Sequence, residues 1–165
     1  MVSFCLDASA LAKRYVPEMG SALVDFLFDQ VAEHRIYVLN IARAEVVSVL
    51  VRKKNVGTIS AAQFSQALLV FDREVIQSSA KHLLDFDNAV VTNALALIVQ
   101  HSINASDAMI LRVTLDVAQQ LRTLGDDLVL VASDQRLLRA AQAEGLVPFN
   151  PETQDQAALA TLVGP

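Results

Sequence analysis

Short runs of consecutive hydrophobic residues recur along the chain and predict the strands of a sheet. The clearest runs are Val2 to Leu6, Ile36 to Leu39 and Leu128 to Ala132, and shorter ones lie at Leu83–Leu84 and Leu146 to Phe149. The runs are continuous rather than alternating, which is typical of strands that are covered on both faces. The pattern therefore predicts a buried sheet of short strands.

Between these runs, apolar residues recur every three or four positions, which predicts amphipathic helices. Asn40 and Ser60 are of the type that caps a helix start, and Gly125 is a natural helix stop. The predicted helices cover Glu18 to His34, Asn40 to Lys54, Ser60 to about Ser78, Asn88 to Gln100, Ala105 to Leu124, a segment that Ser133-Asp134 opens and Gly145 ends, and one short helix after Asn150. Strands separated by helices predict an α/β fold, a three-layer α/β/α sandwich with a mainly parallel central sheet.

Two stripes of apolar residues recur at helical spacing in these segments, and the first marks a helix face that we expect to be buried. One consists of Phe64, Leu68, Phe71 and Val75, and the other of Val91, Leu95 and Ile98. For the first stripe, the sequence leaves open whether it is buried in the core or against another protein chain.

The composition predicts one domain, residues 1–165, with a core from about residue 2 to residue 151 and a short C-terminal tail. The lone cysteine, Cys5, excludes a disulfide framework and favours a reducing compartment. No apolar stretch approaches the length of a membrane span, and no basic segment precedes the first apolar run, so we expect a cytoplasmic protein without membrane association. The net charge of −5 excludes nucleic-acid binding by bulk charge alone, so any such binding must be local.

Three aspartates stand where predicted helices begin, and two of them directly follow predicted strands. Each of Asp7, Asp107 and Asp134 on its own is explained by helix capping, because a carboxylate accepts the free N–H groups of a first turn. Together they indicate more. The carboxyl ends of neighbouring parallel strands converge on one crevice, so acids at those ends can meet although they are far apart in sequence.

A fourth carboxylate, Glu45, lies inside an otherwise apolar helix, where no cap is needed. It is explained either by an ion pair with Arg52, by a solvated edge, or by a functional role. Four clustered acids would repel one another unless divalent cations bound them, and oxygen-only ligands favour Mg²⁺ or Mn²⁺ over zinc. This is the chemistry of metal-assisted phosphoryl transfer.

The segments around these acids resemble the four acidic motifs of the PIN-domain nucleases, and most closely those of VapC-type toxins. The motifs are Asp7-Ala8-Ser9, Ala44-Glu45, Ser106-Asp107-Ala108 and Ser133-Asp134, and the stretches Ala-Glu-Gly-Leu at 143–146 and Asn150-Pro151 also resemble that family. The resemblance runs from Val2 to about Pro151. Each motif is short, but the order, the intervals and the strand or helix context of all four make the match specific.

The resemblance implies a Mg²⁺- or Mn²⁺-dependent endoribonuclease that cleaves RNA phosphodiesters, often in a tRNA or rRNA loop, and leaves a 5′-phosphate. In such a protein Asp7, Glu45, Asp107 and Asp134 are both the catalytic residues and the metal ligands. The resemblance also implies a homodimer that is neutralised by a small antitoxin encoded beside it.

Two serines and two arginines next to these motifs are supporting candidates. Ser9 can hydrogen-bond the first acid or a phosphate, or it can satisfy nearby backbone groups. Ser133 is adjacent to the fourth acid, whereas many family members carry Thr or Ser two positions before it, where this chain has Ala132. Arg14 and Arg43 lie nearest to the acidic motifs among basic residues that otherwise form a solvated face, so we expect them to contact RNA.

Other classes of protein are tested by the same segments. A Rossmann or P-loop domain needs a glycine-rich turn after the first strand, which the residues Asp7 to Leu11 exclude. A phosphotransfer receiver domain is shorter and has a lysine near its site late in the chain. This chain has Asp134 at that place, which argues against a receiver domain. A chromosomal RNA-processing PIN nuclease, and a PIN-like binding module without metal, remain alternatives to the toxin.

Overall fold

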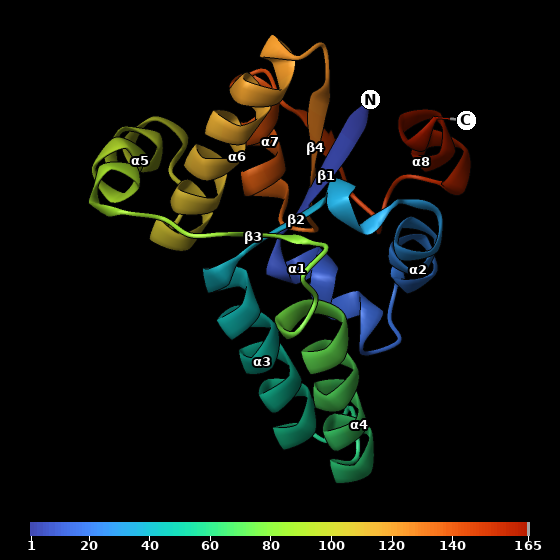
Figure 1. The fold of residues 1–165 in the computed structure, drawn as a ribbon. Coiled ribbons are helices and arrows are strands. Elements are labelled where there is room, and N and C mark those ends of the chain that lie inside the picture. Colours follow the sequence, from blue (N-terminus) through green and yellow to red (C-terminus); the bar gives the residue numbers. More distant parts are fainter. Residues whose placement is uncertain (165) are drawn as a thin grey trace.

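The computed structural model describes residues 1–164 and contains one five-stranded sheet in which all neighbouring strands are parallel. Its order is β3-β2-β1-β4-β5, with β1 in the centre (Figure 1). The strands are β1 (Val2–Leu6), β2 (Ile36–Leu39), β3 (His82–Leu84), β4 (Asp127–Val131) and β5 (Val147–Phe149). The predicted runs are thus strands, and the parallel sheet is confirmed.

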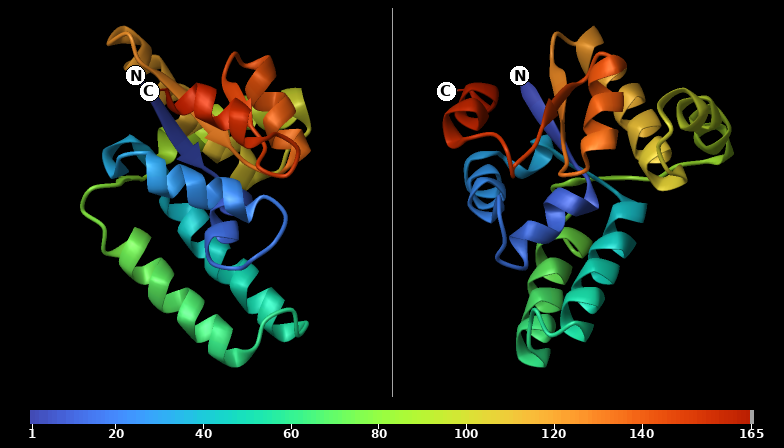
Figure 2. Two further views of the ribbon diagram at one scale, coloured as in Figure 1. Left: turned by 90° about the vertical axis from the view of Figure 1, so that its right-hand side faces the viewer. Right: turned by 180° about the vertical axis from the view of Figure 1, so that it is seen from behind.

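Helices cover both faces of this sheet, as the sandwich prediction requires. Helices α6 and α7, with α5 outside them, lie on one side of the sheet, and α2 and α8 lie on the other (Figures 1 and 2). Helices α3 and α4 extend as a pair beyond the carboxyl ends of the strands. The helices are α1 (Ala8–Leu11), α2 (Ser21–Gln30), α3 (Asn40–Asn55), α4 (Ala61–Phe71), α5 (Asn88–His101), α6 (Ala105–Thr123), α7 (Gln135–Ala143) and α8 (Gln156–Val163), with 3-10 turns at Ala12–Arg14 and Glu33–Arg35 and a π-helical turn at Asp72–Ile76.

Local chemistry explains where some helices begin and corrects one prediction. Ser60 caps α4 in a reciprocal arrangement, because its hydroxyl accepts from the N–H of Gln63 while the Gln63 side chain accepts from the N–H of Ser60. The prediction that Asn40 caps α3 is wrong. Asn40 is the first helical residue, and its side chain bonds Arg43 and Asp85 instead of free backbone N–H groups.

The bounds of two helices also differ from the predicted ones. Helix α2 begins at Ser21 rather than Glu18, because Gly20 has a left-handed backbone that breaks the helical pattern before it. The helix predicted to run from Ser60 to about Ser78 is regular only to Phe71 and then widens into the π-helical turn.

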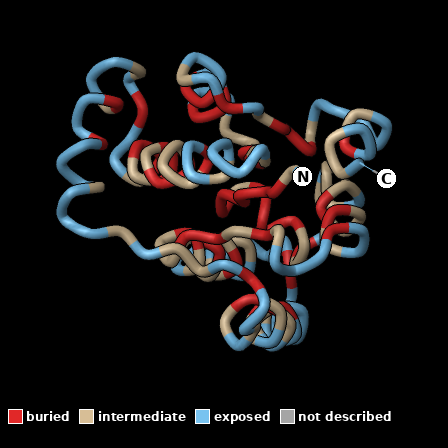
Figure 3. The backbone as a smooth tube through the Cα atoms, turned by 45° about the horizontal axis from the view of Figure 1, so that its top comes forward, coloured by how far each residue is buried: buried red, intermediate tan, exposed pale blue. Residues whose placement is uncertain are grey.

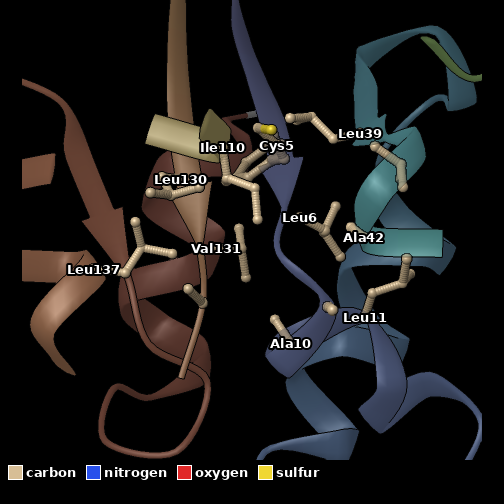
Figure 4. Close-up of a cluster of buried hydrophobic side chains, with 14 of the residues drawn as sticks. Cys5, Leu6, Ala10, Leu11, Leu39, Ala42, Ile110, Leu130, Val131 and Leu137 are labelled. Atoms are coloured by element: carbon tan, nitrogen blue, oxygen red, sulfur yellow. The ribbon is translucent and has the colours of Figure 1, made fainter. Parts of the chain in front are cut away.

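The core is built around the central strands and includes residues of every layer. The side chains of Leu6, Val131, Ile110 and Leu11 belong to one hydrophobic cluster, to which β1, β4, α6 and α1 all contribute (Figure 4). Figure 3 shows buried positions along the strands and exposed positions on the outer sides of the helices. Leu159 of α8 belongs to the same core, so the core extends past the residue 151 predicted as its end.

Helix α5 is present where the spacing of Val91, Leu95 and Ile98 predicts a helix, and the stripe predicted on α4 faces the core. Helix α5 buries Ala94 and Leu97 against α6, and it leaves Val91 41% and Leu95 56% exposed. In the α4 stripe, Phe71 and Val75 are buried, and Phe64 and Leu68 are half-buried and packed against the core.

Within residues 1–164, no single helix is both long enough and apolar enough to cross a membrane. Helices α5 and α6 meet such a criterion only when taken together, and a bend of 112° separates them.

An ion network around the buried Lys13 joins the segment after β1 to the C-terminal part of the chain. Lys13, 3% exposed, contacts Glu18 at 3.0 Å and Glu152 at 2.5 Å, and Lys53 of α3 also pairs with Glu18. Directly beside this network, Gly20 packs on the backbone of Pro151. A Cβ at Gly20 would lie 2.7 Å from the carbonyl oxygen of Pro151.

We therefore expect Gly20→Ala to destabilise the protein by at least about 2 kcal/mol more than Gly57→Ala, measured by urea denaturation. Both glycines have positive φ, 87° and 78°, so the backbone strain of alanine is common to the two variants. Only Gly20 has a neighbour that the new methyl group would strike, since nothing lies within 4 Å of the Cβ position at Gly57. An equal loss of unfolding free energy in the two variants would show that the Pro151 segment moves away from the new methyl group at no cost.

Candidate active site

The structure brings the four candidate carboxylates to one pocket of about 330 Å³ at the carboxyl ends of the strands. We call it the acid pocket. It is lined by Asp7, Ala8, Ser9, Glu45, Ser48, Val49, Arg52, Asn104, Ser106, Asp107 and Asp134. Asp7 follows β1 and Asp134 lies three residues after β4, and between these two strands the chain order of the sheet reverses. Ligands of open α/β sheets bind at this kind of switch point.

Asp7 is held rigidly by hydrogen bonds at the end of β1. Its Oδ2 accepts from the N–H of Ser9 at 3.0 Å and from the Ser9 hydroxyl at 2.5 Å, while its own N–H donates to the carbonyl of Val131. Asp7 is therefore a helix cap, as one explanation of it required. Its burial raises the pKa of the carboxyl, and the charge of Asp134 acts in the same direction against the Ser9 hydrogen bonds.

Ser9 connects the first acidic motif to the fourth. Its Oγ donates to Asp7 and accepts from the N–H of Ser133 at 2.9 Å. Of the alternatives for Ser9, the contact with Asp7 is therefore present in the structure. The Ser133 hydroxyl is buried and has no hydrogen-bond partner among residues 1–164.

Asp107 differs from the other aspartates because its helix already has a cap. Asn104 fills that role, with its Oδ1 accepting from the N–H of Asp107 at 2.8 Å. The Oδ2 of Asp107 is buried without a hydrogen-bond partner in the described chain. Burial raises the pKa of Asp107 to about 6, and the charges of Asp7, Asp134 and Glu45 add to the effect. Capping thus does not explain this carboxylate.

Glu45 and Asp134 complete the set of four. Within residues 1–164, Glu45 forms no ion pair, so the pair with Arg52 that one explanation required is not made, although both residues line the pocket. Burial raises the pKa of Glu45, with a contribution from Asp7. Asp134 caps α7, since its Oδ1 accepts from the N–H groups of Arg136 at 2.7 Å and Leu137 at 3.1 Å.

The donor set fits a hard divalent cation, held by a small number of protein ligands. In the part of the chain that the structure describes, no three acidic, histidine or cysteine side chains are grouped closely enough to hold one ion. Mg²⁺ is commonly bound by only one or two carboxylates and completes its shell with water and substrate phosphates. The oxygen-only donors, their mutual repulsion and the unpartnered Oδ2 of Asp107 fit that mode. Metal binding by all four acids stays a prediction.

The structure does not bring the two arginine candidates into the acid pocket. Arg14 is held by Asp25 at 2.8 Å and Glu74 at 3.1 Å and lies over the ring of Phe28. Arg43 donates to Asn40 at 2.5 Å. These contacts give both residues a structural role, and their contact with RNA is untested.

Residues other than Arg14 and Arg43 surround the four acids. Arg52 lines the pocket, Arg136 lies 3.9 Å from Asp134, and Asn104 and Ser106 line the third side. Arg136 and Asn104 are not among the residues that the sequence motifs single out. The available signals were the position of Asn104 three residues before Asp107, which is the spacing of a helix cap, and the position of Arg136 in the first turn after Asp134.

Residues 4–143 match the PIN domain family, and the chain belongs to that family. No curated protein sequence matches it. The fold is that of VapC-like PIN proteins, which are similar to this chain in structure and distant from it in sequence.

Three solved structures illustrate the similarity. PAE2754 from Pyrobaculum aerophilum has 19% sequence identity and a TM-score of 0.58, and the match covers 89% of each chain. FitAcB from Neisseria gonorrhoeae has 18% identity and a TM-score of 0.59, covering 92% of this chain and 99% of that one. VapC20 from Mycobacterium tuberculosis, a sarcin-ricin loop cleaving toxin, has 16% identity and a TM-score of 0.61, covering 93% and 100%. At these identities the likeness concerns the fold.

We expect Asp107→Asn to stabilise the protein without metal by about 1 kcal/mol, or roughly 3 °C in melting temperature at pH 7.5 in EDTA. A carboxyl whose pKa is raised to about 6 on folding destabilises the folded state above that pH and loses the penalty as the pH falls from about 6 towards 4. The stability advantage of the amide should therefore shrink over the same interval. Added Mg²⁺ or Mn²⁺ should stabilise the variant less than the parent protein.

The matched control is Asp116→Asn, which lies on the same helix away from the pocket. It should respond to metal as the parent protein does. If Asp107→Asn melts lower in EDTA and keeps the full metal response, Asp107 is an ordinary first-turn residue.

Proposed function

We propose that the chain is a Mg²⁺- or Mn²⁺-dependent endoribonuclease that hydrolyses RNA phosphodiesters and leaves a 5′-phosphate. The observation that carries the proposal is the acid pocket, which is lined by the carboxylates of four separate motifs at the switch point of a PIN-domain sheet. Asp7, Glu45, Asp107 and Asp134 are the proposed catalytic residues and the groups that would hold the cation.

The chain's own residues prepare the pocket in two ways. Hydrogen bonds to Ser9 and to the first turn of α7 fix the positions of Asp7 and Asp134, so little reorganisation is needed when a ligand binds. The Oδ2 of Asp107 has no hydrogen-bond partner within residues 1–164 and is free to bind a cation. A bound divalent cation would neutralise these charges, polarise the scissile phosphate and lower the pKa of water. Four of the 18 acidic residues lie here, so much of the net charge of −5 is concentrated at one point.

The proposed substrate is a structured RNA, such as a tRNA or an rRNA loop. The name of VapC20 as a sarcin-ricin loop cleaving toxin supports this choice of substrate class for a chain of similar fold. Recognition of RNA depends largely on the shape of loops and on unstacked bases. Whole cellular RNA is therefore a better test substrate than a short oligomer.

We expect the purified protein to cut structured cellular RNA in the presence of Mn²⁺ and to lose this activity in EDTA. Asp7→Asn should lower the cleavage rate by at least about 100-fold, because it removes one charge from the set that holds the cation. Asp29→Asn, whose side chain is 63% exposed, is the matched control and should cleave normally. The new 5′ ends should be phosphorylated, as shown by ligation to an adaptor.

An inactive parent protein that is no different from Asp7→Asn under all metal conditions would contradict the proposal. It would favour the alternative of a PIN-like binding module without metal. Calorimetric titration with Mn²⁺ separates the two cases, because a binding module of that kind would take up no metal.

We further propose that the protein is the toxin of a toxin–antitoxin pair and a homodimer. The PIN family match and the structural likeness to VapC20 and FitAcB support the pairing with an antitoxin. For the dimer, α5 offers an outer face on which Val91, Leu95 and Val99 are exposed one turn apart, with exposed fractions of 41%, 56% and 84%. An apolar stripe of this kind suits a second copy of the same helix.

Induced expression of the chain should arrest growth, and co-expression of the adjacent short reading frame should relieve the arrest. The resulting complex should contain two copies of this chain, as measured by light scattering. The antitoxin should place an Arg or Lys against the carboxylates of the acid pocket. Normal growth and the absence of a short neighbouring gene would instead favour a chromosomal RNA-processing nuclease.

A further inference from the structure

A second pocket, of about 390 Å³, lies beside the acid pocket between the end of α5 and the outer side of α7. We call it the basic pocket. It is lined by Gln100, His101, Ser102, Arg136, Arg139 and Ala140, with no acidic residue in the lining. Arg136 connects the two pockets, since it lines the basic pocket while its guanidinium lies 3.9 Å from Asp134 of the acid pocket.

The arginines of the basic pocket are available for a ligand, whereas many cations of the chain are not. Six cationic side chains are held in closer ion pairs, namely Lys13, Arg14, Lys53, Lys81, Arg112 and Arg122. Arg139 is exposed and makes no ion pair or side-chain hydrogen bond within residues 1–164. Arg136 is 58% exposed and has only its long contact with Asp134. Both therefore present free guanidinium groups.

The opposite wall of the basic pocket is fixed in place. Glu144 accepts from the amide of Gln100 at 2.9 Å and lies 2.7 Å from Nε2 of His101. This carboxylate is thereby engaged with the wall rather than with the arginines. Ser102, next to His101, has a φ of 53°, a left-handed conformation that is uncommon for a residue other than glycine and that turns the chain sharply at the pocket.

We propose that the basic pocket binds a backbone phosphate of the RNA strand adjacent to the phosphodiester at the acid pocket. The inference rests on the proposed ribonuclease function and specifies the site at which the RNA substrate is held. Arg136 and Arg139 are three residues apart on one helix, so their guanidinium groups lie on the same side and suit the oxygens of a phosphate. An RNA strand is repelled by a chain of net charge −5 and by the four acids, so it needs a local positive site beside them.

The test is RNA binding without cleavage, measured by fluorescence anisotropy of a labelled single-stranded RNA in EDTA. Arg139→Glu should weaken binding at least about tenfold, and Arg139→Gln should weaken it less. The slope of log affinity against log salt should become shallower by about 0.7 for Arg139→Gln, the value for one lost phosphate contact on a single strand. Arg73→Glu is the matched control, because Arg73 is exposed and lies outside both pockets. The substitution changes the net charge by the same amount as Arg139→Glu. The variant should bind within about twofold of the parent protein.

Melting curves will show that the exposed Arg139 variants are folded, so a change in their RNA affinity reports on the basic pocket. Equal RNA affinity of Arg139→Glu and the parent protein overturns the basic pocket, and so does a parent protein that fails to bind RNA. If the parent protein cleaves RNA while Arg139→Glu binds as tightly as it does, the ribonuclease function stands and the phosphate site fails. If Arg139 controls RNA affinity in a protein that never cleaves, the phosphate site stands and the ribonuclease function fails. Loss of antitoxin binding alone in Arg139→Glu would assign the pocket to a protein partner and overturn the proposal.

Discussion

Hydrogen bonds around Asp7 join the two halves of the sheet at the point where the acid pocket opens. Strand β1 pairs with β2 on one side and with β4 on the other, and the backbone of Asp7 continues this pairing by donating to Val131. The Ser9 hydroxyl then bridges the Asp7 carboxylate to the backbone of Ser133. The contacts that join the β1 and β4 segments therefore also position Asp7 and Asp134. The other two acids, Glu45 and Asp107, are carried by α3 and α6.

The same arrangement opposes the stability of the fold. Burial and mutual repulsion raise the pKa values of Asp7, Glu45 and Asp107, which means that the folded chain holds these charges at a disadvantage relative to the unfolded chain. The scaffold offsets part of this by giving Asp7 and Asp134 helix N-termini as partners. Local destabilisation at a preorganised site is a general feature of proteins whose function requires it.

The sequence predicts well those features that depend on neighbouring residues. The continuous runs identify the strands, Ser60 identifies the start of α4, and the acidic motifs identify the residues that share the pocket. The sequence pattern does not predict which residues of a helix are buried when a segment distant in sequence determines their burial. The spacing of Val91 and Leu95 predicts helix α5 correctly, but only the position of α6 determines that Ala94 and Leu97 are its buried residues.

The arginines show the same division. Arg14 is close in sequence to the first acidic motif, yet Glu74, 60 residues away, holds it. Arg136 has only its place in the first turn of α7 to single it out, yet that turn carries it to both pockets. Proximity to a strand end or a helix start therefore locates Asp7, Asp107 and Asp134. It does not locate cations on long flexible side chains, whose ends are placed by ion pairs across the fold.

The pairing of β1 with β4 has a consequence for the chain during its synthesis. Val2 and Leu6 pair with Asp127 and Val131, so the central strand gains its second neighbour only after β4 has been synthesised. Asp7 can be translated early, but its hydrogen bond to Val131 and the bridge to Ser133 form only after those residues have left the ribosome. A nascent or truncated chain that ends before β4 therefore has no acid pocket, and the chemistry of the pocket is withheld until β4 and the residues directly after it have been synthesised.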